Sequence, residues 1–171
     1  MTTIQLTTRI EAPVDRVFDL SRSIDLHLAS TAHTGERAIA GVTRGLIGLN
    51  EEVTWSARHF GIRFRMTVGI TGYDRPHHFR DEMLRGPFQK MEHDHVFEPQ
   101  GSATLMHDTF RFTSPLGPFG GLLVDRALLR PHLLALLEER NGWIKRVAES
   151  NEWERFLSEE FFLLNSIESS S

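Results

Sequence analysis

Residues Phe119–Ser150 read FGGLLVDRALLRPHLLALLEERNGWIKRVAES and form the longest helical pattern in the chain. A helix of about 28 residues would be about 42 Å long. Its apolar residues recur at three-, four- and seven-residue steps and make one stripe: Leu123, Ala127, Leu133, Leu137, Ile144 and Val147. We expect Pro131 to kink or unwind the helix near Leu128–Arg130, because proline lacks a backbone N–H donor. A stripe of this length needs a large apolar partner surface.

The segments before this helix predict that partner, an antiparallel sheet of about seven strands. Residues 3–10 alternate between apolar and polar side chains and predict a half-buried first strand. Pro13 then suits the start of a short helix, and Ser23 suits the N-cap of a second one. A strand over about 36–41 and a glycine-containing loop follow. We expect that loop either to pack on the body or to form a lid over a cavity.

Residues 51–113 predict a meander of five strands. Alternating segments are separated by short turns at Gly61, Asp74–Pro76, Gly86–Pro87 and Pro99–Gly101. One face of such a sheet is apolar and the other is wet. The fold class is therefore α+β, with two short helices after the first strand and the long helix packed on the sheet.

The composition of the chain excludes several classes of function. The chain has 171 residues and a net charge of −4, which suits one domain and gives no basic stripe for nucleic acid. The absence of cysteine excludes disulfides, thiolate metal ligands and cysteine nucleophiles. We see no signal-peptide pattern and no apolar run of about 18 residues, so we expect a cytoplasmic protein without a membrane span.

Four stretches resemble one family: TGERAIAGVTRGLIGLNEEVTWSARHFG (34–61), GPFQKMEHDHVF (86–97), LMHDTFRF (105–112) and SPLGPFGG (114–121). Together with the order of elements, they resemble the helix-grip fold of the START/birch-pollen-allergen superfamily, SRPBCC. The similarity is to a bacterial subgroup mostly labelled polyketide cyclase/dehydrase-like or cell-division inhibitor. It implies a curved sheet wrapped around the long C-terminal helix, with an apolar cavity between them that takes a lipid, sterol or polyketide-like molecule. It carries over no catalytic motif residue by residue.

We divide the chain into a helix-grip domain, residues 1–150, and an extension, residues 151–171. The extension has Trp153, Phe156, Leu157, Phe161 and Leu164 at helical spacing and a polar end that we expect to be disordered. An amphipathic helix here would pack on the body or on a second copy, as in a homodimer. The resemblance also implies a third class of function, an interaction module that partners an oxidoreductase.

Polar residues on the predicted apolar face are the most informative anomaly. Lys90, Glu92 and Asp94 belong to the wet side of their strand, so His93 and His95 point inward. The same parity places Asp81, Asp108 and His59 on the inward side. With turns near Pro87 and Gln100–Gly101, His93 lies opposite both Asp81 and Asp108, and a register slip of two residues would change the partners but not the face.

Three interpretations of this row stay open. The residues form a self-satisfied polar cluster, or they anchor the polar end of an apolar ligand. Alternatively, His93 or His95 is a general base with Asp108 or Asp81, as in a cyclase or dehydratase. A metal site from His93, His95 and a carboxylate is a further alternative, since both rings lie on one face, but no dedicated third and fourth ligands are marked, so we expect no metal and no cofactor. The predicted ligand contacts are Trp55, His59, Phe64, Met66, Met83, Met91, His93, His95, Phe97, Met106, Asp108 and Phe110.

Two further groups receive a structural interpretation. Glu138, Glu139 and Arg140 read as a solvated charge run on the long helix. His77 and His78 read as a solvated pair in a turn.

Overall fold

The computed structural model describes residues 1–114 and 124–158. One antiparallel sheet has the order β1-β7-β6-β5-β4-β3-β2. Its strands are β1 (Thr2–Ile10), β2 (Arg37–Gly41), β3 (Glu52–His59), β4 (Ile62–Asp74), β5 (His78–Arg85), β6 (Lys90–Gln100) and β7 (Ala103–Thr113). The helices are α1 (Val14–Ser21), α2 (Ile24–Ser30), a short 3₁₀ turn η1 (Ala32–Thr34), a π-helical turn η2 (Asp125–Leu129), α4 (Arg130–Ala148) and α5 (Trp153–Leu157).

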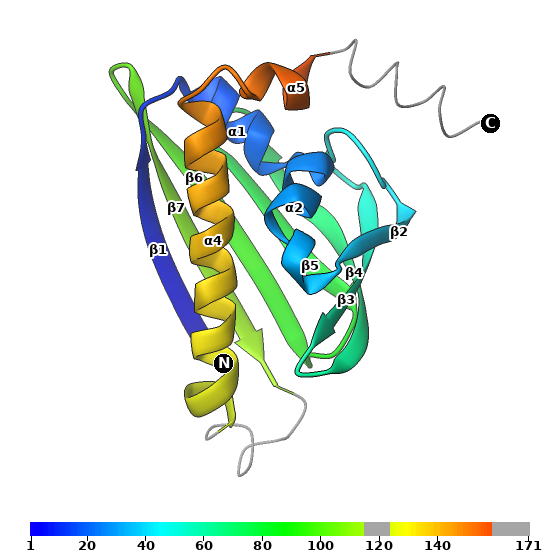
Figure 1. The fold of residues 1–171 in the computed structure, drawn as a ribbon. Coiled ribbons are helices and arrows are strands. Elements are labelled where there is room, and N and C mark those ends of the chain that lie inside the picture. The colour runs from blue at the N-terminus through cyan, green and yellow to red at the C-terminus, as the bar shows by residue number, and fades with distance from the viewer. Residues whose placement is uncertain (115–123, 159–171) are drawn as a thin grey trace, which may run out of the picture.

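The helices lie on one face of the sheet. Figure 1 shows α4 running across that face, with α1 and α2 beside it over the remaining strands. Helix α4 contacts β1, α1 and α2, as expected if one apolar surface holds all of them together. This confirms the predicted α+β helix-grip fold, with two short helices after the first strand.

Helix α4 begins at the position where the proline predicts a break. The turn Asp125–Leu129 is π-helical, and regular α-helix begins at Arg130, so Pro131 lies in its first turn. There the missing N–H costs nothing, because the first N–H groups of a helix have no intrahelical partner. The expected break near Leu128–Arg130 is confirmed. The predicted start at Phe119 lies outside the described residues.

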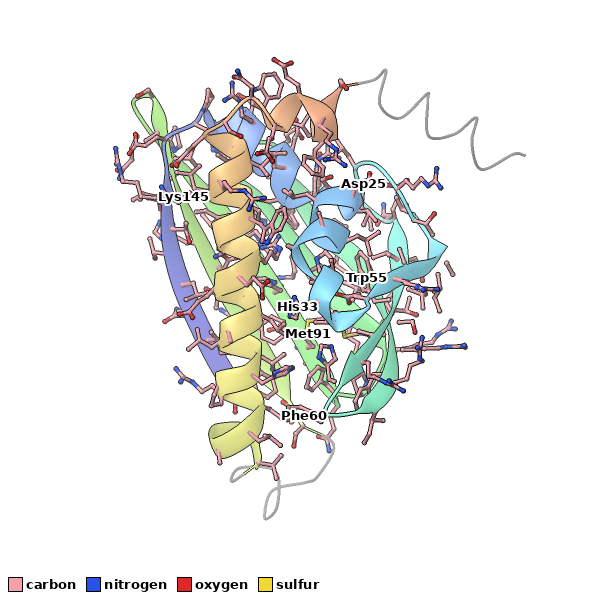
Figure 2. All side chains as sticks on the ribbon, in the orientation of Figure 1. Asp25, His33, Trp55, Phe60, Met91 and Lys145 are labelled. Carbon is pink, nitrogen blue, oxygen red and sulfur yellow. The ribbon has the colours of Figure 1, made fainter. Side chains whose placement is uncertain are left out.

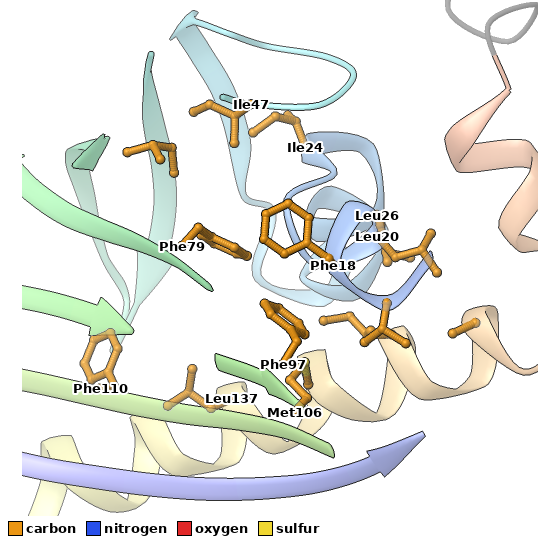
Figure 3. Close-up of a cluster of buried hydrophobic side chains, with 14 of the residues drawn as sticks. Phe18, Leu20, Ile24, Leu26, Ile47, Phe79, Phe97, Met106, Phe110 and Leu137 are labelled. Atoms are coloured by element: carbon orange, nitrogen blue, oxygen red, sulfur yellow. The ribbon is translucent and has the colours of Figure 1, made fainter. Parts of the chain in front are cut away.

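The joint between α1 and α2 places an aromatic side chain in the core. The Ser23 hydroxyl caps α2 by accepting a hydrogen bond from the Leu26 backbone N–H at 3.2 Å. On α1, Phe18 is fully buried, and its ring centroid lies 5.6 Å from that of Phe79 and 5.3 Å from that of Phe97. Figure 3 shows Phe18 reaching from α1 toward these two strand residues. These edge-on contacts fix the helix pair above β5 and β6.

The outward face of the sheet carries its own ionic cluster. Asp94 points to this side, as predicted, but it is buried, because Arg80 and Arg111 fold over it. Arg80 Nε and Arg111 Nη1 lie 2.7 and 2.8 Å from its carboxylate oxygens, and His78 Nε2 lies 3.0 Å away. His78 is therefore a member of β5 with a partner, and its prediction as a solvated turn residue is wrong.

Part of the predicted extension packs on the body of the same chain. Phe156 of α5 is buried and belongs to the main hydrophobic core. Arg16 of α1 lies over the Trp153 ring, 4.3 Å from its centroid. Phe161, Leu164 and the polar end lie outside the described residues. The boundary at residue 150 and the dimer through residues 151–171 both stay predictions.

No helix among the described residues has the length and apolarity needed to cross a bilayer.

We predict that Phe156→Ala lowers the free energy of unfolding by about 2–4 kcal/mol, because it leaves a cavity where α5 meets the core. Urea denaturation followed by circular dichroism measures this loss. Glu154→Ala, on the exposed side of α5, is the matched control and should stay within about 0.5 kcal/mol of the wild type. Equal stability of Phe156→Ala and the wild type would mean that the packing of α5 does not contribute to the stability of the fold.

Candidate functional site

The inward polar row lies on β5, β6 and β7. Asp81 pairs with His93 across β5 and β6, and His95 pairs with Asp108 across β6 and β7. The predicted partner of His93 on β5 is confirmed. Its predicted partner on β7 is wrong by two residues, because Phe110 lies opposite His93. A two-residue shift keeps the face of the sheet, so all four polar side chains still meet on the inward side.

The two imidazoles lie between the two carboxylates. The hydrogen bonds run diagonally: His93 Nε2 donates to Asp108 Oδ1, and His95 Nε2 donates to Asp81 Oδ1, each at 2.9 Å. His95 Nδ1 also lies 2.8 Å from Asp108 Oδ1, but outside the angular range of a hydrogen bond. The ring centroids of His93 and His95 are 3.8 Å apart. Each histidine therefore faces Asp108 with one nitrogen and Asp81 with the other.

Helix α4 closes the cluster from above. Asn141 Nδ2 donates to Asp108 Oδ2 at 2.7 Å and to Thr8 Oγ1 on β1 at 3.2 Å. Arg140 places Nη1 3.7 Å from Asp108 Oδ1 and donates through Nη2 to the Ser21 carbonyl at 2.8 Å. The sheet, the long helix and the end of α1 are thus joined through one polar network.

The sequence analysis missed both helix residues. Arg140 is directed inward with a largely buried side chain, so its assignment to a solvated charge run is wrong, whereas Glu138 and Glu139 are exposed as expected. Asn141 follows Leu137 by four residues and precedes Ile144 by three, which puts an amide inside the apolar stripe. This polar residue inside an apolar stripe is the feature of the sequence from which Asn141 could have been predicted to face the cluster. An amide there requires a buried partner such as Asp108.

Burial and contact oppose each other in setting the pKa values of the cluster. Burial raises the pKa of Asp108, but the contacts with His93 and His95 outweigh it and hold the pKa well below the ordinary aspartate range. Asp81 follows the same pattern: burial raises its pKa, and His95 and His93 lower it further than burial raises it. Both carboxylates are therefore ionised at neutral pH.

The two histidines shift in opposite directions. Burial lowers the pKa of His95, but its contacts with Asp108 and Asp81 outweigh burial and raise it. For His93, burial and the neighbouring His95 lower the pKa by more than the contact with Asp108 raises it. Of the two imidazoles, His95 therefore holds a proton more readily than His93. A positive charge there and on Arg140 offsets the two carboxylates, which lowers the cost of holding them away from water.

A cavity of about 70 Å³ adjoins this network. It lies under the α1–α2 joint, over the inward faces of β3, β4 and β5. Its described lining is Ser21, Arg22, Ser23, Ile24, His27, Ile47, Val53, Trp55, Val68, Ile70, Phe79 and Asp81. Asp81 belongs to both features, since its carboxylate lines the cavity and accepts the hydrogen bond from His95. His93 and His95 lie one layer behind it.

The predicted ligand contacts do not gather in one place. Trp55 lines the cavity, and so does Asp81, which was predicted as a catalytic candidate. His93, His95 and Asp108 form the polar cluster. Met91, Phe97, Met106 and Phe110 are buried in the main core beside the polar cluster, whereas Phe64, Met66 and Met83 are only partly buried. His59 lies apart from the cavity and the polar cluster, because its Nδ1 shares a hydrogen bond of 3.1 Å with His132 Nε2 near the start of α4.

Residues that the sequence analysis did not single out complete the cavity wall. The His27 ring of α2 lies over Trp55, with 4.3 Å between the ring centroids, and its Nε2 lies 3.1 Å from Glu36 Oε2. Figure 2 shows Trp55 beside α2, on the side of the sheet that the helices cover. Only the pairing of α2 with β3 brings these residues together, so neither helix nor strand periodicity signals the contact.

We predict that Asn141→Leu lowers the free energy of unfolding by about 1–3 kcal/mol, because Asp108 Oδ2 loses its donor in a buried site. The measurement is the urea midpoint at unchanged slope. Thr8→Val is the matched control: it removes only the longer hydrogen bond of Asn141 and should cost less than about 1 kcal/mol. Wild-type stability in Asn141→Leu would show that the amide does not support Asp108.

Comparison with known proteins agrees with this architecture. Residues 1–149 match the family model described as "Polyketide cyclase / dehydrase and lipid transport". No curated protein matches the sequence. Similar solved structures include TTHA0849 from Thermus thermophilus, with a TM-score of 0.65 and 20% identity over 84% of this chain and 97% of that one.

Two further structures have the same fold at lower identity. A START superfamily protein from Mycobacterium smegmatis has a TM-score of 0.64 and 13% identity over 85% of this chain and 98% of its own. Major latex-like protein 151 from Panax ginseng has a TM-score of 0.63 and 13% identity over 87% and 98%. The chain therefore belongs to the polyketide cyclase / dehydrase and lipid transport family, as the resemblance in its sequence implied, and it has the fold of START-like proteins.

Proposed function

We propose that this protein binds a small amphipathic molecule whose apolar part lies between the helix pair and the sheet and whose polar end reaches Asp81. The observation that carries the proposal is the placement of Asp81, the one carboxylate in the described wall of a cavity that is also lined by apolar side chains and by the polar residues Ser21, Arg22, Ser23 and His27. Small-molecule sites typically combine apolar walls with a few placed polar groups. The family description, which includes lipid transport, supports the same class of ligand.

The chemistry of Asp81 selects the polar end of the ligand. Its contacts with His95 and His93 keep the pKa of the carboxyl below its ordinary range, so it is ionised and accepts hydrogen bonds. An amine or another donor group therefore suits this position better than a carboxylate, which Asp81 repels. Ile24, Ile47, Val53 and other aliphatic side chains of the lining suit an apolar body.

The size of the cavity implies that it widens on binding. At about 70 Å³ it is well below the roughly 300–1,000 Å³ of sites that enclose drug-sized ligands. The loop between β2 and β3 contributes Ile47 to the wall, and hydrogen bonds to the helix pair are among the contacts that hold the loop in place. Gly45 N donates to Asp25 Oδ2 at 2.6 Å, Ile24 N donates to the Gly45 carbonyl at 2.9 Å, and Arg22 Nη1 donates to the Ile47 carbonyl at 3.1 Å. We propose that these bonds open to admit the ligand.

Acid–base catalysis is the second candidate, and one contact favours it. Asp81 lines the cavity and is bonded to His95, which in turn lies against Asp108. A base that contacts a bound substrate would therefore be Asp81, with His95 as its positioning partner. Incubation of bound ligand with the protein separates the two functions, because an enzyme changes the mass or the isomer of the ligand and a carrier returns it unchanged.

We predict that a twelve-carbon primary amine displaces the neutral dye Nile red at lower concentration than the matching alcohol, and that the matching carboxylic acid is weakest. In Asp81→Asn the preference for the amine should fall by about 10–100-fold, the value of one charge-assisted hydrogen bond. Fluorescence titration at neutral pH measures the three affinities. Glu82→Gln, on the outward face of the same strand, is the control and should keep the preference. An unchanged preference in Asp81→Asn would contradict the assignment.

We predict that Asp25→Ala speeds Nile red association by about 5–10-fold, because the loop loses the bond at Gly45 N, which is worth about 1–1.5 kcal/mol. Stopped-flow fluorescence measures the rate. Asp15→Ala removes the corresponding first-turn carboxylate of α1 and serves as the control. Equal rates in Asp25→Ala and the wild type would show that this loop does not control entry.

A further inference from the structure

We propose that Asp81, His93 and His95 bind a first-row divalent transition-metal ion, such as Zn²⁺, with one coordination position open to the cavity. The inference rests on the geometry of the side chains and does not require the proposed organic ligand. Two imidazoles and one carboxylate are a known donor set for zinc and for non-haem iron. The third ligand that the sequence left unmarked is Asp81.

The donor atoms are already close to coordination geometry. The three ligand atoms lie within 4.8 Å of one another. Asp81 Oδ1 is 2.9 Å from His95 Nε2 and 3.8 Å from His93 Nδ1. A tetrahedral ion with bonds of about 2.0–2.1 Å keeps its ligands about 3.3 Å apart, between these two distances. Changes of about half an ångström bring these two distances to that spacing, and the third pair, His93 and His95, lies within the 4.8 Å limit.

The opposite edges of both histidines meet a second carboxylate. His93 Nε2 lies 2.9 Å and His95 Nδ1 lies 2.8 Å from Asp108 Oδ1. Histidines that ligate metals commonly donate the other ring N–H to a carboxylate, which fixes the tautomer and the ring orientation. Asp108 is itself held by Asn141 and Arg140 of α4. The outer shell of the proposed site is therefore already in place.

One orphaned atom supports the proposal independently. Among the described residues, His95 Nδ1 is the buried side-chain nitrogen or oxygen without a hydrogen-bond partner. Such atoms are rare in folded proteins, because an unpaired polar group is costly to bury. Movement of His95 Nε2 onto a metal ion would turn the ring and allow Nδ1–H to align with Asp108. The ion thus explains a contact that the metal-free geometry leaves unsatisfied.

The site is enclosed on one side and accessible on the other. His93 and His95 are buried, whereas the Asp81 side chain is 19% exposed and lines the cavity. A fourth ligand such as a water molecule can therefore approach only from the cavity. Among the side chains that the structure describes, these three are the one group of at least three potential ligands this close together.

The test uses full-length protein that has been treated with chelator, dialysed and titrated with Zn²⁺ and separately with Co²⁺. We expect one Zn²⁺ per chain by calorimetry and a visible absorption band of low-coordinate Co²⁺. Asp81→Asn and His95→Gln should weaken binding at least 100-fold, and Asp108→Asn by about 10–100-fold as a residue of the outer shell. The control is the double variant His59→Gln, His132→Gln, which removes the other close histidine pair and should bind normally.

Measurements on the wild-type protein test the proposed metal site even if a variant does not fold. X-ray absorption at the zinc edge should show two imidazole ligands, and all remaining ligand atoms should be oxygen. Absence of stoichiometric binding to the wild type would overturn the proposal. So would binding that the His59/His132 double variant loses, or binding that folded Asp81→Asn and His95→Gln retain.

Discussion

Two ionised carboxylates on the apolar face of a sheet are the constraint that the rest of the site satisfies. Asp81 and Asp108 would be costly to bury alone, because each needs hydrogen bonds and compensating charge. His93 and His95 meet this need from β6, and Asn141 and Arg140 meet it from α4. The position of the long helix over β1 and β7 is thus specified by polar contacts as well as by its apolar stripe.

The same constraint joins structure to chemistry. Asp108 is enclosed by the sheet and the helix, whereas Asp81 reaches the cavity beneath α1 and α2. His95 lies between them, so whatever binds at Asp81 changes the environment of the groups that hold α4. A ligand or a metal ion at this point would be linked to the packing of the fold through one side chain.

Sequence periodicity predicted the elements well, because each strand alternates cleanly and the turns contain glycine or proline. It also placed His93, His95, Asp81 and Asp108 on one face. It did not fix the register of β6 against β7, since a shift of two residues leaves the pattern unchanged. Arg140 and Asn141 were missed because partners from a distant strand decide whether a helical polar residue points inward. The cavity depends on how α2 meets β3, which no local pattern encodes.

The comparisons determine the family and the fold, and the low identities to solved structures leave the ligand to be argued from the site. Within that fold, the central claim is that the cavity at Asp81 holds an amphipathic molecule. Native mass spectrometry of protein isolated gently from its own cells, followed by solvent extraction, tests it most directly. We expect an organic adduct that leaves on denaturation and that carries a hydrogen-bond donor at one end of an apolar body. A protein that carries only its own mass under these conditions would contradict the account.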